Sequence, residues 1–198
     1  SRQSRGLGDV YKRQFYGLDI YKKRKLSKLL ENLCEIEGIS WIRLHYAYPN
    51  GFPLDVLNVM SSQPKICNYI DIPLQHISTN ILTSMRRGSN REKINSLISK
   101  FREKVPGIAI RSTVIVGFPG ETKENFDELC DWIKEIKFDR LGCFKYSHEE
   151  NTYAFNLKDD VPDKEKNRRL DKLMKIQANI SHDKNKLKIG KKFKVCID

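Results

Sequence analysis

The residues with the clearest chemical potential lie in a strand and a glycine-rich turn at 110–122, IRSTVIVGFPGET. β-branched residues favour a strand, and glycine allows a ligand to approach the main chain closely. Thr122 is placed to cap the helix that follows. In α/β proteins the ligand crevice lies at the carboxyl ends of such strands, so the turn is predicted to bind a cofactor. A purely structural turn is the alternative.

Polar residues also alternate with apolar ones in the strands expected around this turn. Each strand carries two on one face: Arg43 and His45, Asp71 and Gln75, Arg111 and Thr113, Lys145 and Ser147. Because buried parallel strands are ordinarily apolar on both faces, four polar stripes indicate that one face lines a wet lumen. A half-solvated antiparallel sheet is the alternative, but connections of hairpin length are missing.

The elements that must position these residues alternate along the chain. Strands are expected at 41–48, 69–75, 110–116 and 138–147, and helices at 21–37, 54–60, 79–87, 90–105, 122–136 and 162–187, with a further strand from 193. Such alternation implies a parallel sheet, because each helix returns the chain to the same edge. The predicted fold class is α/β, as a barrel or part of one.

Composition narrows the class of protein. The 198 residues are 39% hydrophobic and contain no run of about 18 apolar residues, so a globular cytoplasmic protein without a membrane span is expected. The formal net charge of +12 gathers at the two ends of the chain, which suits contact with RNA as well as an ordinary solvated surface. Five cysteines stand singly, so neither a disulfide scaffold nor a metal site is predicted.

Several motifs carry a resemblance to a known family. The segments YIDIPLQHISTNILTSMRRG at 69–88 and FDRLGCFKYSHEENTYA at 138–154, together with the strand and turn at 110–122, resemble the radical S-adenosylmethionine methylthiotransferases. The motifs WIRLHYAYP, PLQH and YSHEENT are similar to the branch that modifies an aspartate of small-ribosomal-subunit protein twelve, rather than to the tRNA-modifying branch. The similarity covers residues 15–198.

This resemblance implies a radical mechanism. Members of the family bind S-adenosylmethionine at a [4Fe-4S] cluster, form a deoxyadenosyl radical, and carry a second [4Fe-4S] cluster in an upstream domain. The cofactor supplies the radical chemistry, while protein groups bind and orient it. The candidate cofactor-binding residues are Arg111, Thr113, Ile115, Val116, Gly117, Gly120, Glu121 and Tyr146, and the candidate substrate-binding residues are Gln75, His76 and Ser147.

Some of these residues allow two interpretations. Arg111 needs a carboxylate partner, which could come from the cofactor, from the substrate aspartate or from Asp71 in the sheet. Glu121 either holds the turn or contacts the ligand. His76 follows a strand and could line the lumen, although an isolated histidine is more often structural.

The chain also departs from the family pattern. It has no CxxxCxxC loop for the radical cluster, so it is expected to supply no metal ligands and to be inactive alone. Its strands correspond to the last four of a six-stranded partial (βα)6 barrel, at residues 15–187, followed at 188–198 by the start of a TRAM-like, substrate-binding β domain. Residues 1–14 do not resemble the family and are expected to be non-native, with a genuine basic arm as the alternative.

The expected function is therefore that of a fragment of a methylthiotransferase acting on small-ribosomal-subunit protein twelve, with ribosomal RNA contacted through the basic ends. The alternatives are a fragment of a tRNA adenosine methylthiotransferase, and a noncatalytic piece that binds ribosomal protein or RNA.

Overall fold

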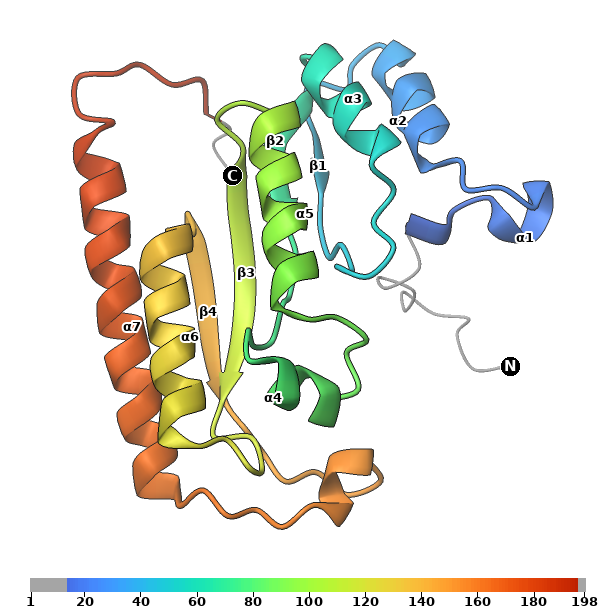
Figure 1. Ribbon diagram of the computed structural model, residues 1–198. Coiled ribbons are helices and arrows are strands. Elements are labelled where there is room, and N and C mark those ends of the chain that lie inside the picture. Colours follow the sequence, from blue (N-terminus) through green and yellow to red (C-terminus); the bar gives the residue numbers. More distant parts are fainter. Residues whose placement is uncertain (1–13, 196–198) are drawn as a thin grey trace.

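The computed structural model describes residues 14–195 and contains a four-stranded parallel sheet (Figure 1). The strands are β1 (Ile42–Leu44), β2 (Ile66–Asp71), β3 (Ala109–Val116) and β4 (Arg140–Lys145), and they are hydrogen-bonded in sequence order. This order and the parallel pairing confirm the predicted α/β class.

Helices gather on one face of the sheet, as Figure 1 shows for α5, α6 and α7. The helices are α1 (Leu18–Tyr21), α2 (Leu26–Glu35), α3 (Asp55–Ser62), α4 (Thr79–Ser84), α5 (Arg91–Lys104), α6 (Lys123–Ile136) and α7 (Asp163–Lys186), with a 3-10 helix, η2, at Tyr153–Asn156. α4 and η2 lie near the carboxyl ends of β3 and β4, where the cofactor turn was predicted.

Side-chain alternation in β3 explains why the sheet has two different faces. Ile110, Val114 and Val116 are completely buried beneath the helices, whereas Arg111 and Thr113 are only half-buried on the opposite face. The helix-covered side holds the core, whose largest buried side chains include Trp132, Phe101, Phe126 and Phe138. The open face therefore has the polar character that the sequence pattern predicted.

The helix starts follow their capping residues. The Asn90 side chain accepts a hydrogen bond from the Lys93 N–H at 2.9 Å, so α5 begins where it was predicted. Thr122 and Asn125 form a reciprocal capping box at the start of α6. This box fixes the direction in which the chain leaves the cofactor turn.

The sheet differs from the predictions in several places, and β1 spans only Ile42–Leu44 instead of 41–48. β2 ends at Asp71, and Gln75 rejoins β3 through an isolated bridge to Val114, with a backbone φ of 72° at Gln75. In β4 the register pairs Phe144 with Ile115. Phe144, rather than Lys145 and Ser147, therefore continues the open-face stripe, so the predicted polar stripe of the fourth strand is wrong.

The predicted TRAM-like domain and the predicted non-native segment lie at the two ends of the described region. Residues 193–195 form no strand, and 196–198 lie outside the described residues, so the TRAM-like domain stays a prediction. Residues 1–13 of the segment expected to be non-native also lie outside them, whereas the Gln14 side chain is buried and bonds to the backbone of Tyr48 and Asn50. Within 14–195, no helix is long and apolar enough to cross a membrane.

Candidate cofactor site

The turn after β3 has the conformation that its glycines permit. Gly117 and Gly120 have φ values of 73° and 80°, in the left-handed region that favours glycine. The Glu121 carboxylate accepts a hydrogen bond from the Gly117 N–H at 2.7 Å, and the Gly120 N–H donates to Asp160 at 2.8 Å. The turn is therefore held in shape by carboxylates from both inside and outside its own sequence.

Glu121 lies beneath the turn rather than facing a ligand space. Its side chain is fully buried, and Arg169 of α7 donates to its Oε1 at 2.7 Å and to its main-chain carbonyl at 2.9 Å. Burial raises the pKa of Glu121, and the Arg169 guanidinium opposes that rise. Of the two interpretations of Glu121, the structure supports the one in which it holds the turn.

His76 packs against the same carboxylate and is also fully buried. Its Nε2 lies 3.8 Å from Glu121 Oε2, and its Nδ1 accepts a hydrogen bond from the Ser78 N–H at 3.0 Å. Because Nδ1 is the acceptor, the neutral ring carries its proton on Nε2. The expectation that His76 lines the lumen and contacts substrate is therefore corrected to a structural position in the core.

A cavity of about 410 Å³ opens beside the turn, at the carboxyl ends of β3 and β4. It is lined by Ser84, Met85, Arg86, Arg87, Ile115, Phe118, Lys145, Tyr146, Ser147, Glu149, Thr152, Tyr153 and Ala154. Three residues predicted from the sequence, Ile115, Tyr146 and Ser147, thus share one cavity. Its position matches the crevice expected at the carboxyl ends of parallel strands.

Aromatic contacts shape this cavity. The Tyr146 ring packs edge-on against Phe118, with centroids 5.1 Å apart, and its hydroxyl donates to the Ala154 carbonyl at 3.2 Å. Elsewhere in the lining, the Arg86 guanidinium lies 3.3 Å from the Tyr153 ring centroid. An apolar and aromatic lining with a few polar groups suits a flat heteroaromatic ligand such as adenine.

On the open face of the sheet, the carboxylate partner of Arg111 is a residue of the protein itself. Its Nη1 donates to Asp71 Oδ2 at 2.5 Å, and Asp71 is fully buried. The bond to Asp71 raises the pKa of Arg111. Arg43 also belongs to this face, because it bonds His45 at 2.8 Å and lies over the Tyr69 ring. The internal partner of Arg111 is thus present, while contact with a cofactor stays a prediction.

Other predicted site residues are placed differently. The Val116 side chain is completely buried under the helices, and its carbonyl accepts from the Tyr146 N–H at 2.9 Å, so it presents no side chain to a ligand. Thr113 is half-buried on the open face. Gln75 borders a separate, small hollow with Pro73 and Arg87.

One lysine and one arginine of α7 were not predicted as part of the site. Lys166 and Arg169 are buried next to the turn, and with Leu173, Gln177 and Ile180 they follow one helix face at spacings of three and four residues. The sequence signal that could have predicted their burial is their position in line with the apolar residues of this helix face.

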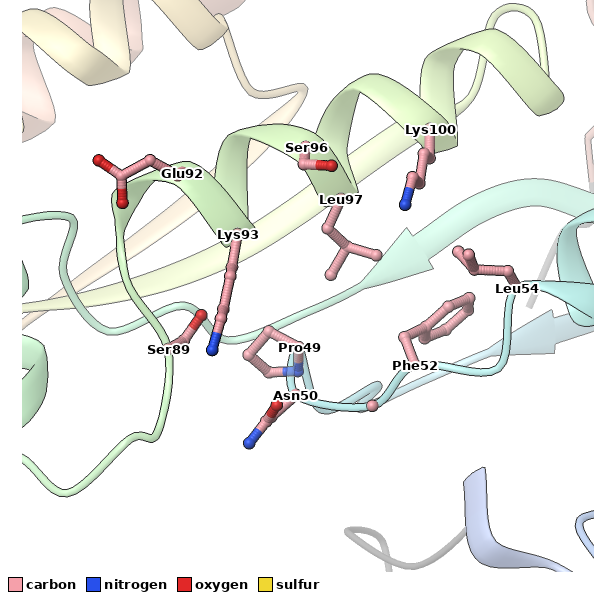
Figure 2. Close-up of a pocket in the computed structure, with 11 residues that line it drawn as sticks. Pro49, Asn50, Phe52, Leu54, Ser89, Glu92, Lys93, Ser96, Leu97 and Lys100 are labelled. Atoms are coloured by element: carbon pink, nitrogen blue, oxygen red, sulfur yellow. The ribbon is translucent and has the colours of Figure 1, made fainter.

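A second cavity of about 460 Å³ lies between the loop that precedes α3 and helix α5 (Figure 2). Figure 2 shows Phe52 and Pro49 on the loop, with Lys93 and Lys100 projecting from α5. None of the candidate cofactor or substrate residues lines it.

Comparison with known proteins identifies the family. The model of the radical SAM superfamily matches residues 10–133, which is more than half of the chain. The chain belongs to the radical SAM superfamily. The match includes β3, the cofactor turn and most of α6, whereas the cavity residues from Lys145 to Ala154 lie beyond it.

The chain also has relatives of high sequence identity. The chain is 60% identical over 184 residues to the ribosomal protein uS12 methylthiotransferase RimO of Christiangramia forsetii, and 50% identical over 185 residues to RimO of Bacteroides thetaiotaomicron. Each alignment covers 93% of this chain, but only 41% and 42% of the respective relative. The chain thus spans about two fifths of the length of these relatives.

Solved structures of radical SAM enzymes share the fold. Coproporphyrinogen III oxidase of Escherichia coli superposes with a TM-score of 0.63 and 22% identity, over 79% of this chain and 37% of that enzyme. The methyltransferase TsrM of Kitasatospora setae, solved with cobalamin and a [4Fe-4S] cluster, gives a TM-score of 0.51 and 19% identity, over 65% of this chain and 26% of that protein. At these identities the likeness supports the fold, which agrees with the parallel sheet.

No cluster of three or more histidine, cysteine or acidic side chains that could hold a metal ion occurs within residues 14–195. Burial raises the pKa of the Cys130 thiol to about 11 and that of Cys143 to about 12, so both thiols are protonated at neutral pH.

Proposed function

We propose that this chain is part of a radical S-adenosylmethionine methylthiotransferase that modifies an aspartate of ribosomal protein uS12. The observation that carries this proposal is 50–60% identity, over 93% of the chain, to several proteins named as uS12 methylthiotransferases. The radical SAM family match and the cavity at the carboxyl ends of β3 and β4 support it.

The residues of this cavity fit S-adenosylmethionine. Ile115, Phe118 and Tyr146 offer apolar and aromatic contact for the adenine, and Ser147 offers a hydroxyl at the rim. An added side-chain atom at Gly120 would meet no other atom within 4 Å, so this part of the turn has free space beside it. When bound, S-adenosylmethionine supplies the radical that abstracts hydrogen, while these side chains orient it and exclude water.

The two [4Fe-4S] clusters of the proposed enzyme are not assigned to residues of this chain. Such clusters are held by cysteine thiolates, and the described residues offer no group of three ligands. The contribution proposed for residues 14–195 is therefore limited to binding and orienting S-adenosylmethionine and the substrate.

The substrate and its surroundings are also proposals. We assign the uS12 loop to the open end of the sheet, near Ser147 and Gln75, and ribosomal RNA contact to the basic ends of the chain. Exposed lysines follow one another from the end of α7 onward, at 186, 188, 191, 192 and 194. Such a cluster favours a polyanionic partner. A cytoplasmic location and a TRAM-like domain that begins at 188 are consistent with this role.

Mass spectrometry of uS12 tests the proposal in cells. In a strain deleted for the gene that encodes this chain, uS12 is expected to lose the methylthio group of its modified aspartate, and the intact gene is expected to restore it. The tRNA of the same strain should keep its methylthioadenosine. Loss of the tRNA modification with unchanged uS12 would instead favour the tRNA-modifying branch.

A further inference from the structure

We infer that the first two turns of α7 position the cofactor turn, with Arg169 and Lys166 holding Gly117 and Glu121 from behind. This inference deepens the proposed function, because it rests on that turn as part of the S-adenosylmethionine site. Neither cation lines the 410 Å³ cavity, so both are positioning residues that act through the turn.

Arg169 connects α7 to the turn through a short chain of hydrogen bonds. Its guanidinium is 6% exposed and donates to the Glu121 carboxylate at 2.7 Å, to the Glu121 carbonyl at 2.9 Å and to Glu165 at 2.8 Å. The Glu121 carboxylate in turn accepts from the Gly117 N–H. A planar guanidinium can serve these three acceptors at once, whereas a lysine ammonium is a single point charge.

Lys166 fills the space behind Gly117. A β-carbon at position 117 would lie only 2.3 Å from Lys166 Cγ, so the lysine stem occupies the volume that any larger residue there would need. Its ammonium pairs with Asp159 at 2.6 Å and lies 5.2 Å from the centroid of the Tyr146 ring. Lys166 therefore touches both the turn and one aromatic wall of the cavity.

A third contact comes from the segment that leads into α7. The Asp160 carboxylate accepts the Gly120 N–H at 2.8 Å. The residues at 159–169 thus contact the turn at Gly117, Gly120 and Glu121, which are its two glycines and its anchoring acid.

The energetic cost of this arrangement supports a positioning role. Buried cations lose their hydration, and well-packed apolar side chains of similar volume are often as stable or more so. The remainder of the same helix face is largely apolar, with Leu173 and Ile180 buried. Stability alone would not require two buried cations where α7 meets the turn. Their hydrogen bonds and packing instead fix the geometry of that turn.

The test uses the intact enzyme that contains this chain, loaded with its clusters, and measures the dissociation constant of S-adenosylmethionine by calorimetry. Arg169→Met is expected to weaken binding about tenfold or more, since misplaced binding groups lose affinity steeply, and Arg169→Lys is expected to lose about threefold. The matched control is Arg168→Met. Arg168 is the neighbouring residue on α7, is 53% exposed, and its ion pair within residues 14–195 is with Glu165. The dissociation constant of S-adenosylmethionine for the Arg168→Met variant should stay within about twofold of the wild-type value.

Thermal unfolding by circular dichroism is followed on each variant, so that affinity is compared only between folded proteins. If Arg169→Met does not fold, Arg169→Lys decides. A folded Arg169 variant with the affinity of the Arg168→Met control would overturn the inference. If the wild-type enzyme does not bind S-adenosylmethionine, the proposed function itself fails, and the two failures are therefore distinguishable.

A double variant separates positioning from general stability. Glu121→Gln removes the carboxylate through which Arg169 acts, so adding Arg169→Met to it should weaken S-adenosylmethionine binding little further. Additive losses from the two changes would show independent effects and would contradict the proposed path.

Discussion

Alanine at position 117 is expected to destabilise the chain by about 3 kcal/mol and to remove detectable S-adenosylmethionine binding from the intact enzyme. Gly117 has a φ of 73°, which strains any residue with a β-carbon, and that carbon would lie 2.3 Å from Lys166 Cγ. Lys166 is buried and paired with Asp159, so it cannot move aside freely. Urea unfolding measures the stability loss, and calorimetry with S-adenosylmethionine measures the binding loss.

Gly120→Ala is the matched control for this prediction. Gly120 has a similar φ of 80°, but a β-carbon there would meet no atom within 4 Å. Its cost should therefore be the backbone term alone, about 1 kcal/mol. Adding Lys166→Ala to Gly117→Ala should recover part of the lost stability by relieving the contact. Equal losses for the two glycine variants would show that the packing of Lys166 against the turn is unimportant.

Acidification from pH 7 to pH 5 is expected to cost the chain about 2 kcal/mol of stability through His76. Burial lowers the pKa of His76 from 6.5 to about 4. The unfolded chain therefore takes up a proton below pH 6.5 that the folded chain binds only near pH 4. The stabilisation from the neutral ring is fully present above pH 6.5 and is lost as the pH falls toward 4.

His76→Asn provides the comparison, because its amide oxygen can still accept the Ser78 N–H but has no proton to gain. Urea unfolding of both proteins at pH 7 and pH 5 gives the difference attributable to His76, since the acidic residues are common to both. Parallel losses of stability in the two proteins would show that His76 titrates normally and is not buried as described.

The sequence predicted the helix starts and the type of sheet better than it predicted the contacts between residues that are distant in sequence. The Thr122 cap, the helix start at 90 and the parallel sheet were predicted from local sequence patterns, and the structure confirms them. The cavity residues Ile115 and Tyr146 were predicted from their place at strand ends, and they do meet. Whether they bind a cofactor stays a prediction.

What the sequence could not supply was the side to which each residue of an irregular segment points. His76 follows Gln75, whose positive φ and shifted bridge to Val114 break the alternation that would have placed its neighbours. The positions of Lys166 and Arg169 against the turn could not be predicted, because Lys166 pairs with Asp159, seven residues away, and Arg169 reaches Glu121, which is 48 residues away in sequence.

The most direct measurement is a crystal structure of the intact, cluster-loaded enzyme with S-adenosylmethionine bound. The adenosine is expected in the cavity beside the turn, with Ile115 and Tyr146 against the adenine and with the Gly117–Glu121–Arg169 contacts intact. Adenosine bound elsewhere, such as in the cavity between the loop before α3 and helix α5 (Figure 2), would contradict the assignment of this turn as the cofactor site.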